Sequence, residues 1–237
     1  MRYRFATGEG IHGIWSRQSV ATKGGRFHTG TYNARMASDP GPAISVLQLR
    51  IALRGLSPPV WRRVLVPEHL TLGRLHNVIQ VVMGWADEHL HTFSIRGRRY
   101  GEAHEGVLQF CTVASELPLT AFHLREHEGF VYVYDFNAWW RHEMRLERRM
   151  LRQQPGQLPR CVAGCGPCPP EDIGGIERYL EARDEHSEYE FVDWIESLRE
   201  GPIVLEDLRD EVDGWLIWLD RRFDRQIVND RLRELEG

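Results

Sequence analysis

What most constrains the fold is a pair of alternating runs that follow one another closely in the chain. In the first, from Ile44 to Leu53, large apolar residues alternate with polar ones such as Gln48 and Arg50. The second, from Val60 to Val66, follows Pro58-Pro59. An alternation of period two is typical of a β-strand with one buried face, and Pro pairs favour turns. We therefore expect two strands joined by a turn.

A helix is predicted directly after these strands. Thr71 is a suitable N-cap, apolar residues then recur at helical spacing, and Gly84 is suited to end the helix. Further strands are expected at Leu90–Ile95, Phe130–Phe136 and Met144–Met150, and further helices near 175–183, 188–199, 202–212 and 225–235. Strands first and helices later indicate an α+β fold, with a mixed or antiparallel sheet packed by helices and a helical C-terminal third.

The chain of 237 residues is divided by its composition into a leader and one domain. Residues 1–43 are rich in Gly, Ser, Thr and Ala, so we expect a poorly ordered, flexible leader, and residues 44–237 are expected to form a single domain. No stretch approaches the roughly 18 apolar residues of a membrane helix, and the N-terminus lacks the apolar core of a secretory signal. These features predict a cytoplasmic protein without a membrane partner.

The net charge of −4 conceals an uneven distribution. Residues 169–237 carry 9 arginines against 21 Asp and Glu, whereas residues 1–168 have a net charge of +8. A basic body of this kind is suited to an anionic partner such as nucleic acid. The alternative is that the acidic residues only form the solvated faces of C-terminal helices.

Three of the four cysteines, Cys161, Cys165 and Cys168, fall within eight residues. The Gly and Pro residues between them allow tight turns that bring thiolates onto one tetrahedral ion, so zinc is the expected cofactor. A fourth ligand would come from elsewhere, such as His142, His89 or His91. Two alternatives remain open: a disulfide, which a reducing cytosol disfavours, and a loop in which the thiols only pack.

Two other clusters contain residues suited to chemistry. In the segment from Trp85 to Phe93, His89 and His91 are two residues apart, so a strand would point both imidazoles the same way, with Asp87 and Glu88 beside them. In the second cluster aromatic residues surround Asp135 and His142 across a predicted hairpin, and the two could approach each other. The alternative for both clusters is that the imidazoles and the paired tryptophans Trp139 and Trp140 serve only in packing. We find no nucleophile elbow, phosphate loop, His-Glu-x-x-His or dinucleotide fingerprint.

Several motifs, in this order along the chain, resemble one protein family. They are Pro58-Pro59-Val60-Trp61-Arg62-Arg63-Val64, Leu75-His76-Asn77-Val78-Ile79-Gln80, Gly84-Trp85, His89-Leu90-His91-Thr92-Phe93, Tyr134-Asp135-Phe136 with His142, and Cys168-Pro169-Pro170-Glu171-Asp172 with Gly174-Gly175. The family is the plasmid pRiA4b ORF-3-like family, also met as a passenger protein of insertion elements, and the similarity runs from about Ser45 to about Leu235. The resemblance implies a single α+β domain linked to mobile elements, with no settled activity.

The sequence departs from this family pattern in two places. Where the family usually continues Asp-Phe with Gly-Asp, this chain has Asn137-Ala138, so a turn glycine and a carboxylate are missing. The family cysteines match Cys161 and Cys168, but a third that often follows Glu-Asp is Ile173 here, and Cys165 is present instead.

Two functions from different classes follow from these observations. The first, which we prefer, is a non-enzymatic accessory module that binds nucleic acid or a protein of the mobile element. The residues expected to contact the partner are Trp85, Trp139, Trp140, Arg62 and Arg63. The second is a metal-dependent hydrolase or nuclease whose side chains converge on an ion that activates water. Its candidate catalytic residues are His89, His91, Asp135, His142, Glu171 and Asp172.

Overall fold

The computed structural model describes residues 42–101, 114–153, 156–198, 209, 212–215, 218 and 221–235. The predicted leader lies outside the described residues except for its last two positions, and so does the predicted helix near 202–212 except for residues 209 and 212. None of the helices within these ranges is long and apolar enough to cross a membrane.

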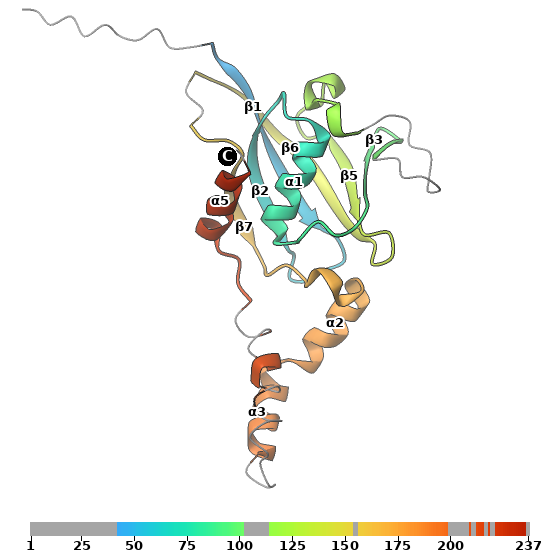
Figure 1. The fold of residues 1–237 in the computed structure, drawn as a ribbon, viewed down its shortest axis with the longest axis vertical. Helices are drawn as coiled ribbons and strands as arrows, with labels where there is room; N and C mark the ends of the chain where they lie inside the picture. Colours follow the sequence, from blue (N-terminus) through green and yellow to red (C-terminus); the bar gives the residue numbers. More distant parts are fainter. Residues whose placement is uncertain are drawn as a thin grey trace, which may run out of the picture. The chain divides into compact units, whose positions relative to one another are not determined.

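Strands in the described ranges form one antiparallel sheet in the order β4-β3-β5-β6-β1-β2-β7, which confirms the α+β fold (Figure 1). The strands are β1 (Ile44–Leu53), β2 (Trp61–Pro67), β3 (His91–Ile95), β4 (Arg98–Gly101), β5 (Gly129–Tyr134), β6 (Trp140–Arg152) and β7 (Arg160–Cys165). Short 3-10 helices lie at Ala114–Glu116 (η1), Leu119–Phe122 (η2) and Glu171–Ile173 (η3). The expected β1, β2, β3 and β5 are therefore present with nearly the predicted bounds.

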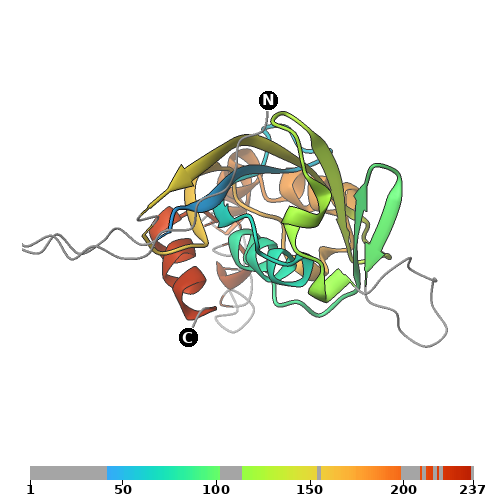
Figure 2. The ribbon, with the colours of Figure 1, turned by 90° about the horizontal axis from the view of Figure 1, so that it is seen from above.

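One face of the sheet is apolar and is covered by the helix α1 (Leu72–Met83), which lies within the curve of the sheet (Figure 2). On β1 this inner face carries Leu47, Leu49 and Ile51, all fully buried. The apolar side chains of α1 pack against them in the same cluster. Burying such side chains stabilises the fold by about 1.5–3 kcal/mol each. The opposite, outer face carries polar residues such as Gln48 and Arg50 and a small separate apolar cluster of Val46, Leu65 and Leu158.

The ends of α1 are formed as the sequence predicts. The Thr71 hydroxyl accepts a hydrogen bond from the backbone N–H of Arg74, which satisfies one of the free donors of the first turn. Gly84 has φ of 82°, and its N–H donates to the carbonyl of Gln80 at 2.8 Å. A left-handed residue here is favoured as glycine because it has no Cβ. The chain then turns sharply at Trp85.

Helices α2 (Ile176–Glu185), α3 (Glu188–Ser197) and α5 (Arg225–Glu234) follow the sheet in the sequence, as expected. α5 is attached to β7 by the Asn229 side chain, which accepts from the N–H of Cys161 at 2.8 Å and donates to its carbonyl at 2.9 Å. Leu232 on α5 and Tyr179 on α2 are both buried in the main core. These contacts make α2 and α5 part of the folded domain.

Three strands differ from the sequence-based expectation. β4 was not predicted, β6 is longer than Met144–Met150, and β7 forms in the Cys/Pro/Gly segment expected to be a turn-rich loop. β6 was under-predicted because its outward positions are charged, although buried and exposed residues alternate along its first seven positions. β7 forms because β2 pairs with it, with Val64 opposite Cys161.

Candidate functional site

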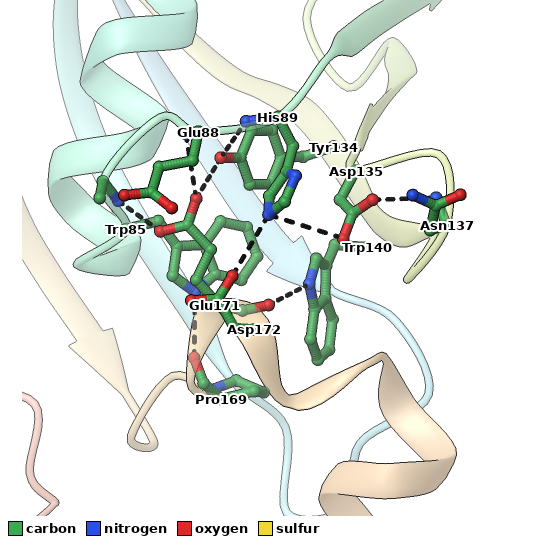
Figure 3. Close-up of polar contacts among 11 residues, drawn as sticks. Trp85, Glu88, His89, Tyr134, Asp135, Asn137, Trp140, Pro169, Glu171 and Asp172 are labelled. Atoms are coloured by element: carbon green, nitrogen blue, oxygen red, sulfur yellow. Dashed lines mark hydrogen bonds and ion pairs between the residues drawn. The ribbon is translucent and has the colours of Figure 1, made fainter.

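Three segments that are far apart in the sequence meet at one end of the sheet (Figure 3). They are the loop after α1, from Trp85 to Leu90, the turn from Asp135 to Trp139 between β5 and β6, and η3 after β7. Together they bring four of the six candidate catalytic residues into one cluster, which comprises His89, Asp135, Glu171 and Asp172. We call this cluster the carboxylate site.

Glu171 connects two of these segments and β5. Its carboxylate accepts hydrogen bonds from the backbone N–H of Ala86 at 2.5 Å and of Glu88 at 3.3 Å, and from the hydroxyl of Tyr134. Hydrogen bonds to an ionised acceptor are stronger than neutral ones. Both carboxylate oxygens are therefore used to hold the loop after α1 against β5 (Figure 3).

His89 lies between two aspartates. Its Nε2 is 3.3 Å from Oδ1 of Asp172 and 4.0 Å from Oδ2 of Asp135. Its backbone N–H donates to the Tyr134 hydroxyl at 3.1 Å, which fixes the loop from which the imidazole projects. Asp135 has φ of 52°, a left-handed conformation that non-glycine residues rarely adopt, and its Oδ1 accepts from the N–H of Asn137 at 2.9 Å. The imidazole is thus within hydrogen-bond distance of Asp172 and at the outer limit of ion-pair distance from Asp135.

Two predicted partner-contacting tryptophans lie in the interior beneath the carboxylate site. Trp85 donates through Nε1 to the carbonyl of Pro169 at 3.0 Å, and Trp140 donates to the carbonyl of Glu171 at 3.2 Å. Their rings are 5.6 Å apart, and both residues are buried. They anchor the segment around η3 and have no free face for a partner. Trp139, in contrast, is 52% exposed.

His142 does not join the carboxylate site. It is fully buried, its Nδ1 lies 3.2 Å from the carbonyl of Trp140, and its ring meets the edge of Trp85 at 5.3 Å. Burial lowers the pKa of His142 to about 3, so the imidazole is neutral. Both residues are described, and no hydrogen bond or ion pair joins His142 to Asp135, so the contact across the hairpin that the sequence left open is not formed.

His91 faces different partners from His89 and belongs to a second polar cluster that includes a residue we missed. Its ring stacks on that of His76 from α1 at 3.6 Å, and burial lowers the pKa of His91 to about 3 and of His76 to about 4. His76 Nε2 lies 2.6 Å from Asp87 Oδ1, and its Nδ1 lies 2.7 Å from the Tyr132 hydroxyl. Polar residues at the buried positions 76 and 80 of an amphipathic helix were the signal for this network.

A cavity of about 540 Å³ adjoins both polar clusters. Residues from the first half of α1 and from the loop before β3 form most of its wall. They include Arg74, His76, Asn77, Asp87, Glu88, His89 and His91. Its volume is in the range of small-molecule sites.

The three clustered cysteines lie in different environments. Cys161 and Cys168 are buried and Cys165 is exposed. Burial raises the pKa of the Cys161 thiol and raises that of Cys168 to about 12, so both are protonated at neutral pH. Within the described ranges, no group of three or more His, Cys, Asp or Glu residues is arranged to hold a metal ion. The zinc site stays a prediction, which metal analysis of the purified chain tests.

The two predicted partner-contacting arginines lie on opposite faces of the sheet. Arg62 is 2% exposed and donates to the carbonyls of Val82, Trp61 and Cys165 at 2.8–2.9 Å, so it is a structural residue that cannot reach a partner. Burial lowers the pKa of Arg62 from its ordinary value. Arg63 points to the outer face, where it forms a bidentate ion pair with Glu147 at 2.5 and 2.8 Å.

The outer face carries a line of arginines that the sequence did not reveal. In the strand register Arg50 of β1 lies directly opposite Arg63 of β2 on one side and Arg145 of β6 on the other. We call these three residues the arginine row. They border a hollow of about 920 Å³, together with Arg148 and two glutamates, Glu143 and Glu147. Glu147 pairs with Arg63, and Glu143 pairs with Arg54 at 3.3 Å.

Comparison with known proteins identifies the family of the chain. The family model described as plasmid pRiA4b ORF-3-like protein matches residues 45–231. The chain belongs to this family. The pRiA4b ORF-3-like chain is also 36% identical, over 141 residues, to the uncharacterized protein y4hQ of Sinorhizobium fredii. That alignment covers 58% of this chain and 71% of the relative.

A solved structure supports the fold of this pRiA4b ORF-3-like chain. It is similar to the crystal structure of a protein of unknown function, MM3350 of Methanosarcina mazei Go1, with a TM-score of 0.59 and 28% identity. The match covers 80% of this chain and 98% of that one. The expected family and fold are therefore both confirmed.

Proposed function

We propose that this pRiA4b ORF-3-like chain is an accessory nucleic-acid-binding module of plasmids and mobile elements, which holds a phosphate backbone on the outer face of its sheet. The observation that carries the proposal is the arginine row. Arg50 faces Arg63 and Arg145 directly across neighbouring strands, where side chains stand about 4.5–5.5 Å apart at Cβ. Like charges in this arrangement repel one another, and an anion placed among them removes the repulsion.

Neighbouring carboxylates neutralise only part of this charge. Glu147 forms an ion pair with Arg63, and the hydrogen bond between them is the main cause of the lowered pKa of Glu147. Within the described residues, neither Arg50 nor Arg145 has a carboxylate at ion-pair distance. A guanidinium is planar and presents paired N–H donors that match two phosphate oxygens. Two guanidiniums without an ion-paired carboxylate, beside a third arginine, suit a polymer with a phosphate at every residue.

The alternative, a metal-dependent hydrolase, has less support from the geometry. In its favour, His89 lies near both Asp135 and Asp172. Against it, Glu171 already accepts three hydrogen bonds and His142 is buried away from the carboxylate site. A stoichiometric divalent metal in the purified chain, together with metal-dependent cleavage lost in His89→Ala, would favour the hydrolase.

The test of the proposed function is binding of the full chain to fluorescent DNA and RNA oligonucleotides, followed by anisotropy at several salt concentrations. Affinity should fall as salt rises, because phosphate contacts release bound counterions. The double variant Arg50→Gln/Arg145→Gln should lower the slope of log K against log salt by roughly 1.4–1.8, since each contact contributes about 0.7–0.9.

Arg178→Gln is the matched control for this test. Arg178 lies on α2, away from the outer face, and its side chain is 74% exposed. The control removes one surface charge and should leave the slope unchanged. The proposal is wrong if the wild-type chain binds no DNA or RNA at low salt, or if the double variant binds like the wild type.

A further inference from the structure

The outer face holds an aromatic ring beside the arginine row. Trp61 begins β2, two residues before Arg63, so both side chains lie on the same face. The guanidinium carbons of Arg50 and Arg63 lie 5.4 and 5.3 Å from the centre of the indole. These distances are within cation–π range. The indole and two of the three arginines therefore form one continuous surface.

The neighbour of Trp61 on β1 leaves space beside the indole. Ala52 is its partner in the strand register, and it offers only a methyl group where a larger side chain would cover the ring. On the far side of Ala52, β6 contributes Glu143, whose carboxylate is paired with Arg54. At this register position only a methyl group therefore lies beside the indole, which is partly exposed.

We infer that the nucleic acid held on this face is single-stranded, with one base stacked on Trp61 and the adjoining phosphates on Arg50 and Arg145. This inference rests on the proposed function. Stacking on an aromatic side chain requires a base with a free face, and a single strand offers one at every nucleotide. In a duplex the bases stack on one another and present only their edges in the grooves. Arginines alone would accept either form, so the indole decides between them.

The first test needs no variant. The full chain is titrated with a 12-nucleotide DNA, its RNA counterpart and the corresponding duplexes at one low salt concentration. Single strands should bind at least about five-fold more tightly than the duplexes, the lower limit of what one base–aromatic stack contributes. Equal or tighter binding of the duplexes overturns the inference and leaves the proposed function standing. No binding to any of these oligonucleotides overturns both.

The second test separates stacking from charge. Trp61→Leu should weaken single-strand binding by about five-fold or more while the salt slope and the duplex affinity stay unchanged, because no phosphate contact is lost. Trp61→Phe keeps an aromatic face and should retain most of the affinity. Thermal unfolding checks that each variant is folded. If Trp61→Leu does not fold, two comparisons still test the inference: Trp61→Phe with the wild type, and single strands with duplexes. Unchanged single-strand affinity in a folded Trp61→Leu overturns the inference.

Discussion

Replacing Glu171 by Ala should destabilise the domain far more than replacing its neighbour Asp172. Glu171→Ala removes two hydrogen bonds from backbone N–H groups and one from the Tyr134 hydroxyl. Ala86 and Glu88 are exposed, so water replaces the carboxylate there and each bond costs only about 0.5–1 kcal/mol. Tyr134 is buried, and although its hydroxyl still accepts from the N–H of His89, its O–H donor loses its acceptor, which adds about 1–3 kcal/mol. The expected loss is therefore about 2–5 kcal/mol.

Thermal unfolding followed by circular dichroism measures this loss. For a chain of this size about 1 kcal/mol shifts Tm by roughly 2–4 °C, so Glu171→Ala should lower Tm by roughly 4–20 °C. Asp172→Ala is the matched control, because it removes the same charge from the adjacent residue. Its carboxylate is 76% exposed and, among the residues that the structure describes, has His89 as its one polar partner, so its loss should cost at most about 1 kcal/mol.

A double-mutant cycle with Tyr134→Phe identifies the cause. If the Glu171 carboxylate acts through the Tyr134 hydroxyl, the double variant should lose less stability than the two single variants together. Equal Tm values for Glu171→Ala and Asp172→Ala would refute the reasoning, because they would show that Glu171 does not hold the loop after α1. Binding to nucleic acid on the outer face should be unchanged in all these variants at temperatures where they are folded.

Three further predictions follow from the leader, the cysteines and the buried histidines. Deletion of residues 1–35, so that the chain begins at Met36, should change Tm by no more than a few degrees, because the leader has too few apolar residues to offset its ordering entropy; a larger fall would show that it packs on the domain. In the native chain iodoacetamide should modify the exposed Cys165 well before the buried Cys161 and Cys168, whose pKa values are raised by burial, as peptide mapping by mass spectrometry can measure; equal rates would contradict this order. His76, His91 and His142 have pKa values lowered by burial to about 4, 3 and 3, from an ordinary 6.5. The unfolded chain therefore binds more protons than the folded one below about pH 6.5, so unfolding at acidic pH should take up as many as three protons and Tm should fall from pH 7 toward pH 4. A Tm that is constant over this range would show that these imidazoles are not buried as neutral groups.

Local patterns predicted the helices α1, α2, α3 and α5 and five strands, of which β6 is longer than expected, because these elements are determined by neighbouring residues. The N-cap Thr71 and the left-handed Gly84 both follow from the sequence, since each acts within its own turn. β4 was missed because Arg98–Gly101 is short and polar, and β7 because its glycines and cysteines indicate turns. β4 forms by pairing with β3, and β7 forms by pairing with β2. A local sequence pattern does not predict such pairing.

The site was predictable only in part, for the same physical reason. Sequence patterns selected His89, Asp135, Glu171 and Asp172, and the structure brings these four together. The predicted strand already places the adjacent Arg62 and Arg63 on opposite faces, but the sequence could not show that Arg62 is the buried one and Arg63 the one on the outer face. The arginine row was also hidden, since Arg145 reaches Arg50 only through the pairing of β1 with β6, about ninety residues apart in the chain.

Photo-crosslinking tests the central claim, that the outer face of the sheet contacts nucleic acid, most directly. The full chain is irradiated with a single-stranded oligonucleotide that contains 5-iodouracil, and crosslinked residues are identified by mass spectrometry. Our account predicts crosslinks in β1, β2 and β6, with Trp61 among the modified residues and none in Trp61→Leu at that position. Crosslinks confined to α5, to the exposed Trp139 or to the wall of the cavity beside α1 would contradict it.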